Sequence, residues 1–188
     1  MAANIHQKIT PTNKEVFFTD KEFIVSKTCS KGHITYINRS FMHISAFKEE
    51  ELLGRPHNII RHPDMPRGVF RLLWSTLQAG DEFFGFIKNL CADGSFYWVF
   101  ANVTPDHDER GKLKGYYSIG RNPNKEGVEA ITPIYQKMLA IEAKSSSSAA
   151  PAASVKYLMK FVEQSNLTYS QFVLDLYGFK TISQKGAV

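Results

Sequence analysis

Three prolines, at positions 56, 63 and 66, interrupt the middle of the chain and restrict what can form there. Proline fixes φ and lacks a backbone N–H, so neither a helix nor a central strand can run through this stretch. The stretch from Gly54 to Pro66, GRPHNIIRHPDMP, also contains two histidines, two arginines, an asparagine and an aspartate. Helical patterns lie on both sides of it, and three strand patterns follow. This layout predicts a polar cluster at the mouth of an apolar pocket.

Two strands and two short helices are predicted before the prolines. Residues 21–37 have the pattern of a strand, a tight turn and a second strand. Asn38 is a favourable N-cap for a short helix. A second helical turn over residues 48–53 is predicted to end at Gly54.

A helix and three strands are predicted after the prolines. Pro66 is tolerated in the first turn of a helix, and the apolar residues that follow it at helical spacing are Val69, Phe70, Leu73, Trp74 and Leu77. Residues 83–91, 95–104 and 113–122 predict strands, the first two joined by an Asp93-Gly94 hairpin turn. The sum is an α+β domain, a five-stranded antiparallel sheet with helices across one face.

The remaining segments flank this domain. The predicted organisation is an N-terminal segment or cap over 1–20, the α+β domain over 21–124, an exit helix over 125–143, a Ser/Ala/Pro linker over 144–154 and a helical tail over 155–188. A tail of this length cannot bury a useful core alone. We therefore expect it to dock on its own domain, on a second copy or on another protein.

Composition narrows the class of protein. The formal net charge is +5, but the basic residues are scattered, so we expect no nucleic-acid partner. Cys29 and Cys91 lie far apart and form no CxxC motif, which is typical of reduced thiols in a cytoplasmic protein. We expect no membrane span and no signal peptide, because no apolar run reaches the roughly 18 residues that a span needs.

The order of the elements resembles the PAS fold, and the Phe96–Trp98 run after the hairpin turn supports that resemblance. The central stretch is more specific. It resembles the signature of the PAS domains of the aerotaxis-receptor family, whose members bind FAD and sense redox state. The resemblance covers roughly residues 20–140 and includes Tyr36-Ile37-Asn38, Trp74, Lys88-Asn89 and Tyr97-Trp98.

This resemblance implies a function and a set of site residues. It implies a non-enzymatic signal-transduction sensor that binds FAD non-covalently and reports redox, oxygen or energy state. The implied partner is a chemoreceptor-like membrane signalling protein in trans, with the sensor itself a homodimer, similar to the short stand-alone PAS proteins of bipartite energy-taxis systems. The implied cofactor-binding residues are Asn38, His57, Asn58, Arg61, His62, Asp64, Trp74, Phe83, Asn89 and Tyr97.

The chain departs from the family at one of these positions. Aerotaxis receptors have a tryptophan where this chain has Phe83. Phenylalanine can pack against a flavin ring, but it lacks the indole N–H donor.

Physical roles can be assigned to the residues of the central stretch. Arg61 and His62 are candidates for binding a pyrophosphate, and Arg67 could join them at the start of the next helix. Asp64 is better suited to fixing Arg61 or His62, or to capping that helix.

Strand alternation predicts two faces of the sheet. On one face Gly85 and Ala101 leave room for a flat ring, and Asn89 offers both a donor and an acceptor to its polar edge, as the matching asparagine does in flavin-binding LOV domains. The other face carries too much aromatic surface to remain wet. We expect the N-terminal segment, the tail or a dimer partner to cover its residues, which are Phe84, Phe86, Phe96, Trp98, Phe100, Tyr117 and Ile119.

Other chemistries remain open or are disfavoured. FMN could replace FAD, and haem could use His57 or His62 as an axial ligand. A cofactor-free PAS module for dimerisation or scaffolding is a further alternative. Residues 54–66 contain no cysteine for a thiol–flavin adduct, His57, His62 and Asp64 make a poor metal ligand set, and no nucleotide or nucleophile motif indicates an enzyme.

Overall fold

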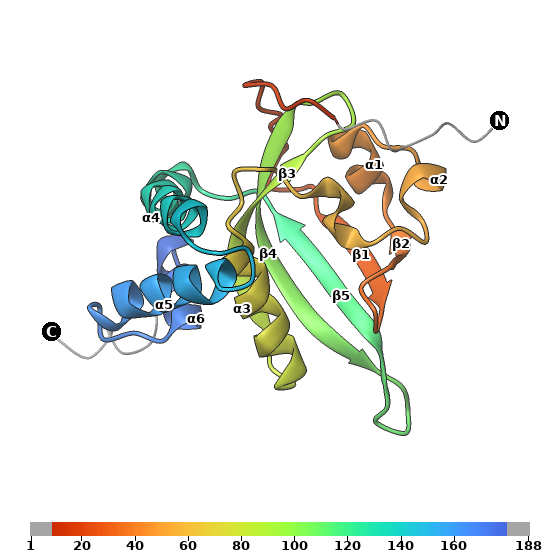
Figure 1. Ribbon diagram of the computed structural model, residues 1–188. Helices are drawn as coiled ribbons and strands as arrows, with labels where there is room; N and C mark the ends of the chain where they lie inside the picture. Colours follow the sequence, from red (N-terminus) through yellow and green to blue (C-terminus); the bar gives the residue numbers. More distant parts are fainter. Residues whose placement is uncertain (1–8, 180–188) are drawn as a thin grey trace, which may run out of the picture. The chain divides into compact units, whose positions relative to one another are not determined.

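The computed structural model describes residues 9–179 and contains one five-stranded antiparallel sheet in the order β2-β1-β5-β4-β3 (Figure 1). This confirms the predicted fold class. The strands are β1 (Ile24–Cys29), β2 (Ile34–Ile37), β3 (Phe83–Leu90), β4 (Phe96–His107) and β5 (Leu113–Arg121).

Six α-helices and one 3₁₀ helix connect or follow these strands within the described residues. They are α1 (Arg39–Ser45), α2 (Glu49–Leu52), the 3₁₀ helix η1 (His57–Ile60), α3 (Arg67–Gln78), α4 (Lys125–Lys144), α5 (Ala150–Glu163) and α6 (Tyr169–Leu176). The prolines act as the sequence predicts. Pro56 precedes η1, and Pro66 occupies the N-cap position of α3.

The described residues form two compact units. The first contains residues 9–63, 88–99 and 105–122, and the second contains residues 64–87, 100–104 and 123–179.

In the first unit, β1 lies between β2 and β5 and pairs with both in antiparallel register. The register places Ser26 opposite Ser118 and Thr28 opposite Tyr116. Helix α1 packs on β1 and buries Phe41 and Ile44. Positive φ at Gly94, +87°, fits the predicted hairpin turn, because glycine adopts this conformation without a steric penalty.

The N-terminal segment extends the sheet of the first unit. Backbone hydrogen bonds join Phe96 to Lys14 and Val16, at 2.9 and 2.7 Å, and join the Thr12 N–H to the Gly94 carbonyl at 2.7 Å. These bonds pair the N-terminal segment with the start of β4, and its cover of the aromatic face stays a prediction. Residues 1–8 of the predicted cap lie outside the described residues.

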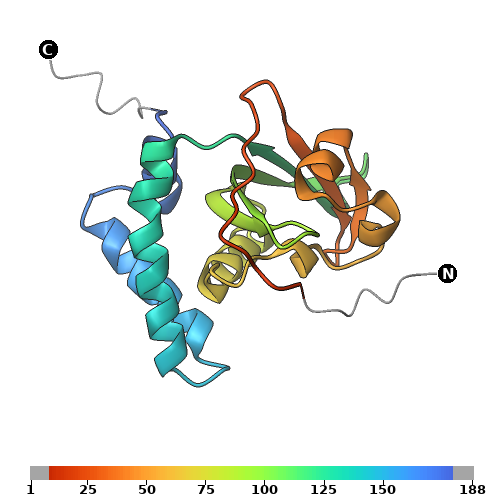
Figure 2. The same ribbon diagram turned by 90° about the horizontal axis from the view of Figure 1, so that it is seen from above.

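In the second unit, the C-terminal helices pack together and against α3. Helix α5 contacts α3 and α4, and α6 contacts α4 and α5 (Figure 2). Tyr177 stacks on Phe100 with 4.1 Å between ring centroids, and the Tyr135 hydroxyl donates to the Phe86 carbonyl oxygen at 2.9 Å. Up to residue 179 the tail therefore packs on other helices of its own chain, rather than only on a second copy or another protein.

The linker predicted over 144–154 is only partly present, because α5 already begins at Ala150. Five residues, 145–149, separate it from α4. Alanine has the highest helix propensity, and Pro151 falls in the first turn, where proline is tolerated. Ala150 and Ser154 are fully buried, so packing in the second unit holds this segment helical.

Candidate functional site

The segment around η1 is fixed to strands on both of its sides in the first unit. On the β2 side, the Ile34 N–H donates to the Arg55 carbonyl at 2.8 Å, and the His57 N–H donates to the Gly32 carbonyl at 3.0 Å. At its other end, Arg61 forms an isolated bridge with Asn89 of β3. Ile60, 1% exposed, anchors the middle in the core. The polar side chains of the segment thus extend from a rigid backbone.

His57 faces β1. Its Nε2 lies 3.0 Å from Oγ of Ser26, and its ring meets Phe41 edge to face, with centroids 6.2 Å apart. Removal from water lowers the pKa of His57 from 6.5 to about 4, because the apolar surroundings penalise the charged imidazolium. The ring is therefore neutral at pH 7 and offers one N–H donor and one acceptor nitrogen.

His62 lies deeper than the sequence suggests for a phosphate ligand. Its side chain is buried, and its ring meets Phe96 at an angle of 65° with centroids 5.7 Å apart. The Lys88 ammonium lies 4.1 Å from the centroid of the same phenylalanine ring. Arg61 is partly exposed and Asn58 is exposed. Of these residues, Arg61, Asn58 and Lys88 are at least partly exposed to solvent, so their side chains are accessible to an anionic ligand.

Asn89 and Tyr97 form the buried polar part of the site. Asn89 on β3 is 7% exposed, and Tyr97 on β4 is fully buried. Among the described residues, the Tyr97 hydroxyl has no hydrogen-bond partner. Burial raises the pKa of Tyr97 far above its ordinary value, and the neighbouring Asn89 amide opposes this rise only in part.

A buried hydroxyl without a partner is costly. Leaving such a group without a hydrogen bond costs about 1–3 kcal/mol of folding free energy. The Tyr97 hydroxyl is therefore a donor that a ligand bound beside it could use. The Thr28 hydroxyl of β1 is a second buried oxygen of this kind within the described residues. Both groups belong to the first unit, as His57 and Asn89 do.

Sequence reasoning missed Ser26 and Thr28. The signal was present in the alternation of β1, where Ile24, Ser26 and Thr28 share one face and Ser26 is only 2% exposed. A buried serine in the middle of a strand needs a partner, and that partner is His57.

Asn38 has a structural task. Its Oδ1 accepts hydrogen bonds from the N–H groups of Phe41 and Val25, at 3.0 and 3.1 Å, and its Nδ2 donates to the Phe23 carbonyl at 2.7 Å. The side chain caps α1 and ties it to β1. A contact to a cofactor would compete with these bonds.

Three of the ten predicted residues belong to the second unit. Asp64 is exposed, and Trp74 on α3 is 36% exposed. Phe83 is buried and stacks on Tyr169 of α6, with ring centroids 5.7 Å apart and the rings 25° from parallel.

The space beside Gly85, predicted to leave room for a flat ring, is occupied by side chains of this chain. A Cβ at Gly85 would lie 2.9 Å from the Phe83 ring and 3.0 Å from the Tyr169 hydroxyl. Side chains of this chain fill that place, because α6 brings Tyr169 there.

The described residues bring no three His, Cys, Asp or Glu side chains into an arrangement able to hold a metal ion. Within the same range, no helix has the length and apolar character needed to cross a membrane.

Comparisons with known proteins identify the family. Residues 34–119 match the family model described as PAS fold. The chain is 37% identical over 133 residues to the aerotaxis receptor of Escherichia coli (strain K12), covering 71% of this chain and 26% of that protein. The chain carries a PAS domain of the aerotaxis-receptor family.

Two more distant matches are a curated relative and a solved structure, and the solved structure shows the fold alone. The chain is 26% identical over 117 residues to the nitrogen fixation regulatory protein of Klebsiella pneumoniae, covering 61% of this chain and 24% of that protein. A light-oxygen-voltage domain studied with a flavin analogue has the same fold, with a TM-score of 0.52, 18% identity and coverage of 61% of this chain and 86% of that one. The chain spans about a quarter of the length of these two curated relatives.

Proposed function

We propose that this PAS domain binds a flavin non-covalently, as FAD, and reports redox or oxygen and energy state to a signalling partner. The observation that carries the proposal is the buried Tyr97 hydroxyl, which has no partner among the described residues and lies beside Asn89 in the first unit. The relationship to the E. coli aerotaxis receptor supports the choice of a redox sensor.

The residues of the first unit fit the needs of a flavin. The polar edge of an isoalloxazine ring requires donors and acceptors inside an apolar slot, and Asn89, Tyr97 and neutral His57 supply them. The anionic end of FAD requires cations near solvent, and Arg61 and Lys88 are partly exposed. His62, by its burial, is better placed to pack than to bind phosphate.

A bound flavin would supply a reducible ring whose polar edge gains a proton on reduction. The side chain that reads this change must be able to accept in one state and donate in the other. Asn89 has both functions. Ser118, opposite Ser26, is a second candidate, whereas Asn122 already donates to the Asp20 carboxylate at 2.8 Å.

The proposed partner is a chemoreceptor-like membrane signalling protein that the PAS domain meets in trans from the cytoplasm, with the PAS domain acting as a homodimer. The support for this partner is the family relationship alone. The aligned region is about a quarter of the matched receptor, so most of that receptor lies outside the comparison. Catalysis has no part in this proposal.

An absorption spectrum of the purified protein, with chromatography of the released cofactor, tests the proposal. We expect flavin bands and co-elution with FAD, and we expect Asn89→Ala to weaken binding or to block signalling. A Soret band would indicate haem instead. Protein that stays colourless after incubation with FAD or FMN would contradict the proposal and favour a cofactor-free PAS module.

A further inference from the structure

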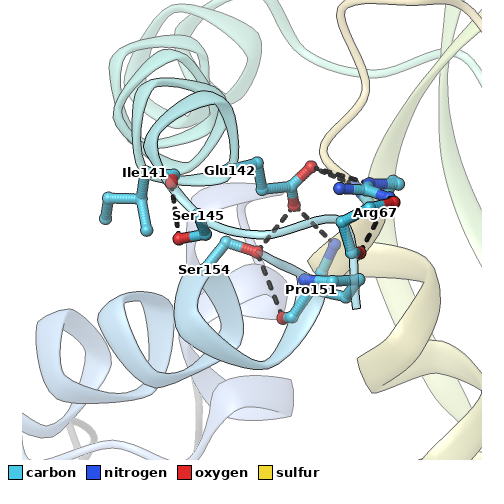
Figure 3. Close-up of polar contacts among 8 residues, drawn as sticks. Arg67, Ile141, Glu142, Ser145, Pro151 and Ser154 are labelled. Atoms are coloured by element: carbon cyan, nitrogen blue, oxygen red, sulfur yellow. Dashed lines mark hydrogen bonds and ion pairs between the residues drawn. The ribbon is translucent and has the colours of Figure 1, made fainter. Parts of the chain in front are cut away.

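A buried carboxylate joins three helices of the second unit. Glu142, near the end of α4, is 8% exposed. Its Oε1 accepts a hydrogen bond from the Gly68 N–H at 2.9 Å. The same atom accepts a hydrogen bond from the Ser154 hydroxyl at 2.6 Å (Figure 3). Its Oε2 accepts from the Arg67 N–H at 3.1 Å and lies 3.6 Å from Nε of the same arginine. One side chain thus contacts α3, α4 and α5.

Glu142 accepts the hydrogen bonds at the N-terminus of α3, where α3 has no capping side chain of its own. The first N–H groups of a helix need acceptors, and a side chain at the N-cap usually provides one. The N-cap of α3 is Pro66, which makes no side-chain cap. Glu142 provides the acceptors from another helix, and its negative charge is favourable at the positive end of the α3 dipole.

The close approach of α5 to α3 depends on a glycine. At Gly68, a Cβ would collide with Oγ of Ser154 and would lie 3.1 Å from the Pro151 carbonyl oxygen. The first turn of α5 therefore seats on the first turn of α3, and Ser154 can reach Glu142. The contact between Ser154 and Glu142 is polar and buried, so its loss removes one of the donors that compensate the carboxylate.

The connection between α4 and α5 can act as a hinge. Residues 146–149, three serines and an alanine, are exposed. Arg67, whose side chain is 37% exposed, reaches this connection and donates to the carbonyl and hydroxyl oxygens of Ser147, at 3.2 and 3.4 Å. Arg67 thus ties the hinge to the same carboxylate network.

Helices α5 and α6 also hold to each other. Phe161 of α5 meets Phe172 of α6 edge to face, with centroids 6.0 Å apart. The two helices can therefore move as a pair about the connection at 145–149.

We propose that α5 and α6 form a hinged lid on α3 and α4, and that the Glu142 network with Arg67, Gly68 and Ser154 is the latch that keeps the lid docked. The surface on α3 and α4 then has one occupant, this chain's own helix pair. Opening the lid also separates Tyr169 from Phe83 and Tyr177 from Phe100, but it does not unfold β1, β2 or β5.

Amide hydrogen exchange of the full-length protein, read by mass spectrometry, tests this proposal. In Glu142→Gln we expect exchange in α5 and α6 to rise about ten- to a hundredfold, because bonds to a charged acceptor are lost. Exchange in β1, β2 and β5 should stay at the wild-type rate. Glu129→Gln is the matched control, since it removes the same charge from an exposed position on α4.

Two further variants keep the test decisive if Glu142→Gln folds poorly. Ser154→Ala removes one bond of the latch and should open the lid by a smaller factor than Glu142→Gln. Gly68→Ala should also open it, and Ser154→Ala should recover part of that effect by removing the colliding hydroxyl. Unchanged exchange in α5 and α6, or an equal rise throughout the sheet, would overturn the latch.

Discussion

Nε2 of His57 lies 3.0 Å from Oγ of Ser26, and this pair joins the proline-rich segment to β1. The hydrogen bond is between neutral groups, because the His57 imidazole is desolvated and its pKa is lowered to about 4. The pair therefore has a defined dependence on pH.

Stability should fall as the pH decreases from about 6.5 towards about 4. In this window the unfolded chain takes up a proton on His57 and the folded chain does not, so acid favours unfolding. The full stabilisation is present above pH 6.5, and about 3 kcal/mol of it is lost by pH 4. Chemical denaturation of wild type and His57→Gln at pH 4.5 and 7 measures the difference. His43→Gln, at an exposed position, is the control and should retain the wild-type dependence.

Tyr97→Phe should separate stability from ligand binding. Without added flavin, the free energy of unfolding should stay unchanged or rise by up to about 1 kcal/mol, because the lost hydroxyl has no partner among the described residues. Affinity for FAD, followed by flavin fluorescence, should fall.

Tyr135→Phe is the matched control for this variant. Its hydroxyl donates to the Phe86 carbonyl, so its loss should cost about 1 kcal/mol of stability. A Tyr97→Phe protein that loses stability as Tyr135→Phe does would argue against a hydroxyl held ready for a ligand.

The local signals in the sequence were sufficient for all five strands and for most of the helices of the fold. Asn38 at the start of α1 and Asp93-Gly94 in the hairpin act through neighbours a few residues away, so a short window of sequence reveals them. The helical start at Ala150 was not visible in the same way. An alanine- and serine-rich segment suits either a linker or a helix, and contacts with α3 and α4 decide between them.

The site was less predictable because its pairs are distant in sequence. Ser26 and His57 are 31 residues apart, and nothing in either local pattern specifies the other. The same holds for Phe83 and Tyr169, where α6 fills a place that strand alternation alone assigns to a ligand. The family signature located the polar segment. It could not show that His62 is buried and Arg61 partly exposed, because packing decides which side chains face solvent.

Gly85→Ala should loosen the contact between β3 and α6. The new methyl group would press on the Phe83 ring and the Tyr169 hydroxyl, and overpacking of this kind costs about 1–3 kcal/mol. Denaturant titration measures the loss of stability. In a Tyr169→Phe background the cost should be smaller, because one of the two crowded atoms is absent. Equal costs in both backgrounds would show that Tyr169 does not fill this place.

Phe83→Trp introduces the tryptophan that the resemblance to aerotaxis receptors implies at this position, and its effect should depend on the tail. Phe83 is 1% exposed and stacks on Tyr169, so a larger ring has no free space and should destabilise the protein by about 1–3 kcal/mol. In a Tyr169→Ala background the indole should fit at lower cost. A double-mutant cycle on the free energy of unfolding should therefore show a coupling of about 0.5–3 kcal/mol, the range seen for residues in contact. Additive effects would mean that the tail and the phenylalanine at position 83 are independent features of this chain.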